Sequence, residues 1–342
     1  MTNRLELNWK LEGFVDEQRY YCSETPIDLD NLPLPKAVLA GDVRTHIDSD
    51  CVMGKKYYLR MGAVKNNLEK MSDEKSILFG KEWTPQNLSN LAKFWLNSDN
   101  AIIDSSSRIS QLTDLSGNNF HFTQSNNAQK PILVTQPDAK VIRYDGVDDC
   151  LQITSGSALN ISKNTDGLWV FIVARKASLD SASIPRRLFV YERGTSASTR
   201  FGLFSDDGTG NSLNKFVAGC RRLDADPYQY QASPNTVTTN ATILCGFINY
   251  ATGILELSEN GSVYSKSIGG TANTSDTSST KVTLGGQNGL ESFNGDIYEV
   301  ISGNGNLNTT DRQKLEGWAA HKYGVINSLP SNHPYKTLIP TL

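Results

Sequence analysis

A run of seven apolar residues, Leu168 to Ala174, places the strongest limit on the folds open to this chain of 342 residues. The run reads Leu-Trp-Val-Phe-Ile-Val-Ala and is too short to cross a bilayer as a helix. Successive side chains of a strand point to opposite faces, so a strand of this sequence must be covered on both sides. We therefore expect it between two stacked sheets.

Short apolar runs bounded by Gly, Asn, Ser and Thr recur along the chain and predict an all-β fold with many short strands. In the larger, C-terminal part we expect strands at 141–144, 243–250, 254–257, 281–284 and 296–301. Asn260-Gly261 predicts a hairpin turn, because both residues tolerate positive φ. No internal repeat of 20 to 50 residues is visible in the sequence, which argues against a solenoid or propeller.

Two helices are also expected. Thr84 followed by Pro85 is typical of a helix start, with threonine as N-cap and proline at the first helical position. Asn308 caps a second, longer helix whose residues Leu315, Trp318, Ala319 and Lys322 share one face. Gly324 is expected to end that helix at C′.

Composition excludes several classes of function. The chain has 33 basic and 36 acidic residues and no basic patch, so nucleic acid is not an expected partner. It contains no apolar stretch of 18 residues and no signal-peptide h-region, so we expect no membrane insertion and synthesis in a cytoplasm. The five cysteines lack a Cys-x-x-Cys pair, which favours reduced, buried thiols over a disulfide framework or zinc site.

Residues 1–80 resemble a fibronectin type III domain of the kind found in phage tail proteins. The resemblance rests on the Leu-Asn-Trp strand that ends at Trp9, on Tyr-Tyr-Cys-Ser-Glu-Thr-Pro-Ile-Asp, and on 55–64 with its Tyr-Tyr-x-Arg-Met-x-Ala core. It implies that Tyr57 is the corner tyrosine, whose hydroxyl bonds to nearby backbone. It also implies that the chain begins near the second strand, so that a partner subunit would cover an unpaired edge.

Residues 81–326 resemble the laminin-G-like (concanavalin A-like) jelly roll of microbial and phage proteins. Four stretches carry the resemblance by their order and spacing: Asp-Leu-Ser-Gly-Asn at 114–118, Tyr-Asp-Gly-Val-Asp-Asp at 144–149, Phe-Asn-Gly-Asp-Ile-Tyr-Glu-Val at 293–300, and Leu-Glu-Gly-Trp-Ala-Ala-His-Lys-Tyr-Gly at 315–324. The expected fold is a small sandwich followed by a jelly roll with a short C-terminal helix. Residues 327–342 are expected to form an extended tail.

The two resemblances together imply a non-enzymatic bacteriophage virion protein, made in the host cytoplasm. It would be a tail fibre or tail-tip component, attached through residues 1–80 to other virion proteins and binding host-surface glycan with its jelly roll. A homo-oligomer is expected for such a component. Two alternatives remain open at this point: a capsid decoration or head-fibre protein that only adds structural contacts, and an enzyme that degrades polysaccharide.

One connection of the jelly roll combines aromatic rings with planar polar groups, which are the groups that bind sugars. These candidate ligand-binding residues are Arg221, Arg222, Asp224, Asp226, Tyr228 and Tyr230. An Arg-Arg-x-Asp-x-Asp element is also found in the domains that the chain resembles. The sequence equally allows a structural interpretation, which we prefer, in which an Arg–Asp network holds a long loop against the sheet.

Calcium is the one cofactor that the resemblance suggests, since laminin-G relatives can hold it in loops at the rim of a sheet. The residues that could supply oxygen ligands are Asp114, Asn118, Asp145, Asp148 and Asp149. Asp and Asn beside Gly are also typical of turns and Asx caps, and this is the preferred interpretation.

Catalysis is not indicated. A retaining glycosidase needs two carboxylates about 5 to 5.5 Å apart on one strand face. The nearest candidates, Asp296 and Glu299, are three positions apart and point to opposite faces unless a bulge intervenes, so ordinary bonded carboxylates are expected. The four histidines lie in no catalytic motif, and His321 and His333 are expected to be structural.

Overall fold

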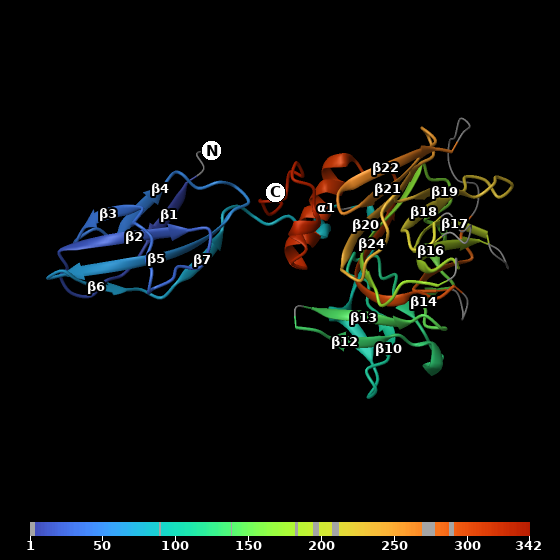
Figure 1. Cartoon of the computed structure of the whole chain (residues 1–342), viewed down its shortest axis with the longest axis horizontal. Helices are drawn as coiled ribbons and strands as arrows, with labels where there is room; N and C mark the ends of the chain where they lie inside the picture. The colour runs from blue at the N-terminus through green and yellow to red at the C-terminus, as the bar shows by residue number, and fades with distance from the viewer. Residues whose placement is uncertain are drawn as a thin grey trace. The chain divides into compact units, whose positions relative to one another are not determined.

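The computed structural model describes residues 4–88, 90–137, 139–181, 184–193, 198–206, 212–268, 278–286 and 291–342 (Figure 1). The chain divides into two compact units. Unit 1 comprises Met1–Trp83 together with Thr337–Leu342, and unit 2 comprises Thr84–Lys336. The residues expected as a tail after 326 are therefore distributed between the two units.

Unit 1 consists of two sheets that face each other. One has two strands, β1 (Leu5–Asn8) and β4 (Thr45–Asp48), which pair antiparallel. The other has the order β3-β2-β5-β6, with β7 also paired to β5, in the described residues. Its strands are β2 (Glu17–Ser23), β3 (Ala37–Ala40), β5 (Lys56–Lys65), β6 (Leu68–Met71) and β7 (Lys75–Leu78).

A small core joins these two sheets. Leu5 of β1 packs with Tyr20, Tyr57 and Leu59 of the larger sheet. The Val52 N–H donates to the Tyr57 hydroxyl at 2.9 Å, which is the local backbone contact expected of this tyrosine. The C-terminal segment adds a strand-like edge, since Ile339 N–H donates to the Gly54 carbonyl at 2.8 Å.

Unit 2 is a sandwich of two antiparallel sheets, as expected of the jelly-roll class. Within the described residues the first sheet has nine strands in the order β19-β18-β17-β16-β23-β14-β11-β10-β9. In chain order these are β9 (Ala101–Ile103), β10 (Ile109–Leu112), β11 (Phe122–Thr123), β14 (Leu151–Ile153), β16 (Arg187–Arg193), β17 (Ser198–Phe204), β18 (Val217–Cys220), β19 (Gln229–Ala232) and β23 (Lys281–Leu284).

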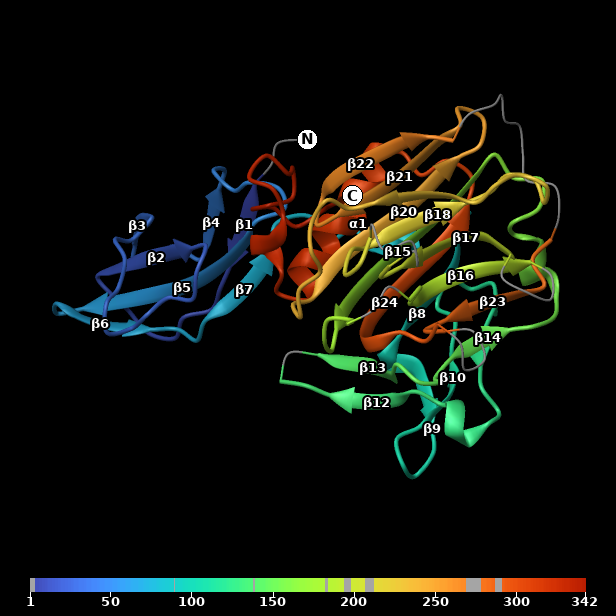
Figure 2. The same ribbon diagram turned by 45° about the vertical axis from the view of Figure 1, so that its right-hand side comes forward.

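The second sheet has the order β12-β13-β24-β15-β20-β21-β22, with β8 paired to β24, among the strands that the structure describes. Its strands are β8 (Ala92–Asn97), β12 (Ile132–Thr135), β13 (Lys140–Asp145), β15 (Gly167–Lys176), β20 (Thr242–Asn249), β21 (Ile254–Glu259), β22 (Ser262–Ser267) and β24 (Asn294–Asn304). Figure 2 shows β20, β21 and β22 side by side, with β18 of the other sheet next to them. The expected hairpin at Asn260-Gly261 joins β21 to β22, and both residues have positive φ.

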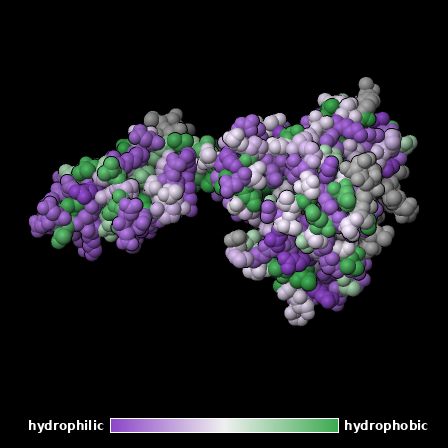
Figure 3. All heavy atoms as spheres, viewed as in Figure 1, coloured by the Kyte–Doolittle hydropathy of each residue, from purple (hydrophilic) through white to green (hydrophobic). Residues whose placement is uncertain are grey.

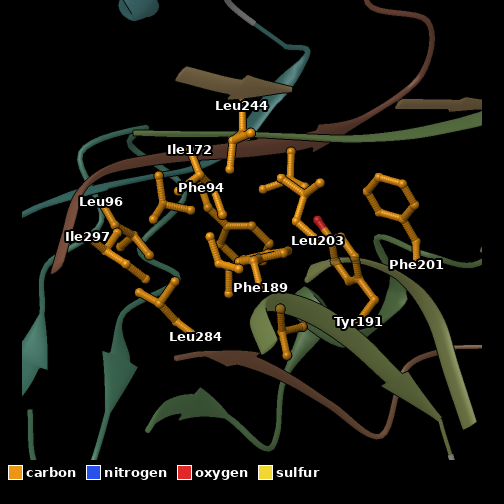
Figure 4. Packing of buried hydrophobic residues seen from close by; sticks show 14 of the residues in the cluster. Phe94, Leu96, Ile172, Phe189, Tyr191, Phe201, Leu203, Leu244, Leu284 and Ile297 are labelled. Carbon is orange, nitrogen blue, oxygen red and sulfur yellow. The ribbon is translucent and has the colours of Figure 1, made fainter. Parts of the chain in front are cut away.

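The core of unit 2 lies between the two sheets (Figure 4). Phe94 and Ile172 of one sheet pack there with Phe189 and Leu203 of the other. The ring of Phe94 lies 5.3 Å from that of Phe122 in an edge-on arrangement. Buried aromatic rings in this geometry fill the space between the sheets and fix their separation.

The apolar run in β15 is fully buried, but only one of its faces lies between the sheets. Leu168, Val170 and Ile172 belong to the core, whereas Trp169 and Phe171 point to the opposite face and are also inaccessible to solvent. This outer face is covered by helix α1 (Thr309–Lys322), which packs on β20 (Figure 1). The sequence indicated burial on both sides, and the second cover is a helix.

The ends of α1 match the sequence expectation. Asn308 is the N-cap, and its side chain accepts the N–H of Asp311. Gly324 has φ +66° at C′, and the Val325 N–H donates to the Ala320 carbonyl at 2.9 Å, which is a Schellman end. The remaining helices are short 3-10 segments: η1 (Pro85–Leu88), η2 (Ser98–Asn100), η3 (Asn127–Gln129), η4 (Ser157–Asn160) and η5 (Ile326–Ser328). None of the helices in the described ranges has the length and apolar character needed to cross a bilayer.

A β-bulge interrupts β24. The partner of Val173 is Glu299, while the partner of Ala174 is Ile297, so Tyr298 is an extra residue. The bulge shifts the alternation by one position, and Ile297 and Val300 consequently both enter the core. Asp296 and Glu299 therefore both lie on the outer face, which corrects the expectation that they point to opposite faces.

We predict that Phe94→Ala lowers the free energy of unfolding of unit 2 by about 3–5 kcal/mol, the usual cost of a large cavity in a packed core. The measurement is denaturant unfolding followed by tryptophan fluorescence, which reports unit 2 through Trp95, Trp169 and Trp318. Ile103→Ala, at a residue 43% exposed on β9, is the control and should cost less than about 1 kcal/mol. Equal costs for the two variants would contradict the packing described above.

Candidate functional site

The candidate glycan residues lie at the edge of the nine-stranded sheet, five of them in the connection between β18 and β19 and the sixth, Tyr230, in β19 itself. The connection is a compact loop, because the Leu223 N–H donates to the Asp226 carboxylate at 3.0 Å and the Asp226 N–H donates to the Leu223 carbonyl at 3.2 Å. Arg222 lies 3.9 Å from the same carboxylate. Asp226 thus holds the shape of the loop.

A buried arginine from another strand fixes this loop to the sheet. Arg200 of β17 is 1% exposed, and it donates to the Asp224 carboxylate and to the Arg222 carbonyl. The Arg221 N–H donates in turn to the Arg200 carbonyl at 2.9 Å. Leaving a buried guanidinium without a partner is costly, so Asp224 stabilises the fold here. This is the Arg–Asp network of the structural interpretation.

The two tyrosines and the first arginine form a separate group on the same edge, which we call the Tyr228 cluster (Arg221, Tyr228 and Tyr230). The rings of Tyr228 and Tyr230 are 4.8 Å apart and edge-on. The Arg221 guanidinium lies 5.3 Å from the centroid of the Tyr228 ring, a cation–π distance. All three side chains are partly exposed.

Gly219 of β18 leaves the space in which the ring of Tyr228 lies. A Cβ atom at Gly219 of β18 would lie 2.5 Å from Cε1 of Tyr228, so only glycine lets the ring lie on the strand. The Tyr228 hydroxyl has no hydrogen-bond partner among the described residues. Burial of the hydroxyl raises its pKa well above the usual value, so it is protonated and can donate.

Further polar residues on the outer face of this sheet were not identified from the sequence. Glu192 of β16 is buried and lies 3.6 Å from Arg187 and 3.3 Å from Lys281. The sequence did contain a signal for these polar residues, because Arg200 and Glu192 are charged residues next to strand residues that are otherwise apolar.

Three of the five candidate calcium ligands lie together. Ligand oxygens of Asp145, Asp148 and Asp149 are within 4.8 Å of one another in the described part of the chain. Burial, together with the charges of Asp145 and Asp148, raises the pKa of the Asp149 carboxyl to about 6. Asp149 accepts the Asp145 N–H at 2.9 Å, and Asp145 accepts the N–H of Val147 at 2.8 Å. These are the contacts of a turn.

Asp114 and Asn118 lie in a different turn and are not part of this acidic group. The Asp114 carboxylate accepts the N–H groups of Trp95 and Phe120, each at 3.0 Å. The Asn118 amide donates to the Lys93 carbonyl at 3.2 Å. Both side chains thereby connect the loop after β10 to strand β8, so the five candidates do not form one site.

The bulge brings Asp296 and Glu299 to one face, yet both carboxylates are buried and already paired with basic side chains. Asp296 is 3% exposed and forms ion pairs with Arg143 and Arg175, which lower the pKa of its carboxyl despite burial. Glu299 is fully buried beneath α1, where it accepts from Trp95, Lys322 and Tyr323. Neither group is placed to meet a sugar.

The two C-terminal histidines also have structural partners. His333 Nε2 lies 3.1 Å from the buried carboxylate of Glu316, which also accepts from Ser258 and Arg312. His321 Nε2 lies 3.1 Å from the Tyr335 carbonyl. Both contacts fix the segment after α1 against the helix.

No family model matches the sequence, and no curated protein matches it. Among solved structures, the chain is similar to the binding domain of Paraclostridial Mosquitocidal Protein 1, at 16% identity and a TM-score of 0.49 over 66% of this chain and 52% of that one. It is also similar to the botulinum neurotoxin serotype D/C binding domain, at 13% identity and a TM-score of 0.46 over 68% and 52%.

A third similar structure is Domain 4 of AbnA, a GH43 extracellular arabinanase from Geobacillus stearothermophilus, in complex with arabinotriose. There the identity is 15% and the TM-score 0.47, over 67% of this chain and 99% of that one. The chain spans about half the length of the toxin binding domains that it matches. Each of these TM-scores is below 0.5. The description of unit 2 as a sandwich therefore rests on its own sheet topology.

We predict that Asp149→Asn stabilises the protein at neutral pH. The folded state raises the pKa of this carboxyl from 3.8 to about 6, so it favours the protonated form, and stability falls as pH rises through that window. Removing the charge should raise the free energy of unfolding at pH 7.5 by about 1–3 kcal/mol and leave it nearly unchanged below pH 4. Denaturant unfolding at several pH values measures this.

Asp99→Asn, at an exposed carboxylate of the same unit, is the control and should change little at any pH. A loss of stability in Asp149→Asn at pH 7.5 would contradict the prediction. If removal of calcium from the wild-type protein reproduced that loss, the ionised carboxylate would be a cation ligand.

Proposed function

We propose that the chain is a non-enzymatic glycan-binding protein in which unit 2 binds a cell-surface polysaccharide through the Tyr228 cluster. The observation that carries the proposal is the partly exposed pair of tyrosine rings beside Arg221. Aromatic rings and planar hydrogen-bonding groups of this kind are what a sugar ring requires.

The cluster offers complementary groups within one small area. The C–H face of a pyranose or furanose packs on an aromatic ring, and the exposed part of Tyr230 supplies such a surface. Arg221 donates through a planar guanidinium that matches vicinal hydroxyls or a carboxylate. The Tyr228 hydroxyl is buried against β18, so the exposed part of the ring, and not its hydroxyl, is the surface that Tyr228 offers to a sugar.

The loop is suited to binding because it is held in place before a ligand arrives. Arg200 and Asp224 fix it to β17, and Gly219 fixes the position of the Tyr228 ring. Little conformational entropy would be lost on binding to such a preorganised group, and that favours affinity. The residues of the structural network and the residues proposed to meet the ligand are therefore different members of one loop.

A binding role without catalysis is supported by the state of the nearest carboxylate pair. Asp296 is buried in ion pairs with Arg143 and Arg175, and Glu299 is buried beneath α1 in an ion pair with Lys322, so neither carboxylate is open to a glycosidic bond. A hydrolase would need another acid and base at its ligand site. Within the described loop, Asp224 is paired with the Arg200 side chain and Asp226 accepts a backbone N–H.

We further propose that the chain belongs to a bacteriophage virion, as a tail-fibre or tail-tip component in which unit 1 docks to other virion proteins and unit 2 projects to the host glycan. The support is the resemblance of both sequence segments to phage modules. Homo-oligomeric assembly is part of the proposal. Quantitative mass spectrometry of purified particles tests it, since a few copies per virion fit a fibre or tip, and hundreds of copies would instead indicate capsid decoration.

We predict that Tyr230→Ala lowers the affinity of the full chain for its glycan at least about tenfold, as is usual for an aromatic residue at the centre of a binding site. The measurement is a glycan array with the labelled wild-type chain, followed by titration of the best saccharide. Tyr58→Ala is the matched control, because Tyr58 is a partly exposed tyrosine 5.2 Å from a cation, Lys56, in unit 1.

The proposal is contradicted if no saccharide binds the wild-type chain, or if both tyrosine variants bind equally well. Release of reducing ends from the bound polysaccharide would contradict the non-enzymatic role while leaving recognition intact.

A further inference from the structure

Unit 1 contains an apolar groove of about 960 Å³ beside β1. One wall is formed by residues Leu7 to Leu11, and the floor by Leu59, Met61 and Ala63 of β5. No residue of β4 lines the groove, so it lies along the edge of β1 that β4 does not occupy. Among the described strands, β4 is the only partner of β1.

The groove exists because the two sheets of unit 1 differ in width. Directly paired residues of antiparallel strands point to the same side, and Lys75 is paired with Leu59, which is in the core. Lys70 is likewise paired with Ala63, and Leu68 with Lys65. These side chains of β6 and β7 therefore point to the inner side of the larger sheet, where no strand of the small sheet covers them. Leu68 is 78% exposed on that inner side.

An extended strand is the occupant that this geometry requires. The free edge of β1 offers a row of backbone N–H and C=O groups, and a second strand is what can pair with them in register. Its alternate side chains would pack on Met61 and Leu68 and complete the core. The exposed apolar residues of unit 1 are interleaved with hydrophilic ones on the face shown in Figure 3, so apolar character alone does not single out the groove.

Charge identifies the partner more closely. Four lysines line the groove: Lys10, Lys65, Lys70 and Lys75. Its acidic residues are Glu12 and Asp73, and the remaining cation, Arg60, is already paired with Glu74 at 3.7 Å. The excess of lysine favours a strand that carries acidic residues beside its apolar ones.

We propose that unit 1 binds a partner polypeptide by strand addition, taking an extended segment with alternating apolar residues and acidic flanks into the groove beside β1. This names the kind of partner for the docking role given to unit 1 above, and it rests on that role. Glycan binding by unit 2 is measured separately and does not depend on it.

The test uses the full chain and a fluorescent peptide in which valines alternate with threonines between aspartate ends. Polarisation should show saturable binding to the wild-type chain. Leu68→Glu should weaken binding at least about tenfold, since it puts a carboxylate on the groove wall opposite the acidic peptide. Val38→Glu is the matched control, because Val38 is 58% exposed on β3 and does not line the groove, and its affinity should stay within about twofold.

Circular dichroism establishes that both variants are folded. Absence of binding by the wild-type chain, equal binding by the two variants, or equal binding of a lysine-flanked peptide would each overturn the proposal. So would a wild-type dimer in light scattering that Leu68→Glu dissociates, because the occupant would then be a second copy of this chain.

Discussion

The structure of unit 2 depends on the burial of β15 from both sides. Its inner residues hold the two sheets together, and its outer residues, among them Trp169 and Phe171, need a cover of their own. Each large apolar side chain contributes roughly 1.5–3 kcal/mol when it leaves water, so an open outer face would be strongly destabilising. Helix α1 supplies the cover, and two buried carboxylates hold it there: Glu299 of β24 accepts from Lys322 of the helix, and Glu316 of the helix accepts from Ser258 of β21.

This arrangement decides which surfaces remain for function. The part of the eight-stranded sheet beneath α1 is closed together with Glu299, and Asp296 of the same strand is enclosed by its ion pairs with Arg143 and Arg175. The nine-stranded sheet has polar and aromatic groups on its outer side, at the edge where β18 and β19 meet. The sandwich of unit 1 is incomplete by comparison, since its small sheet leaves part of the facing sheet uncovered. One unit is thus a completed sandwich with a polar edge, and the other is a sandwich with room for a strand.

Much of the fold could be predicted from local patterns. The run at Leu168–Ala174, the Asn260-Gly261 hairpin and the capped C-terminal helix are each determined by neighbouring residues, and the structure contains all three. The bulge at Tyr298 could not be predicted, because counting by two along a strand does not reveal an extra residue. It moved Glu299 to the face of Asp296 and placed Glu299 under the helix.

The candidate site was predictable in part for a similar reason. The residues of the β18–β19 loop are contiguous, and their chemistry was visible in the sequence. Their division into structural and ligand-binding roles could not be predicted, because Arg200, whose side chain forms an ion pair with Asp224, comes from another strand. The calcium candidates show the same limit. Asp145 and Asp149 are close in sequence and lie together, whereas Asp114 joins a turn that packs on β8.

Native-state hydrogen exchange read by mass spectrometry tests the central claim, the burial of β15 on both faces, most directly. The account predicts that amides of β15 and of its neighbours β20 and β24 exchange most slowly in the chain, at rates set by global unfolding of unit 2. Exchange of β15 amides as fast as those of exposed loops would contradict it.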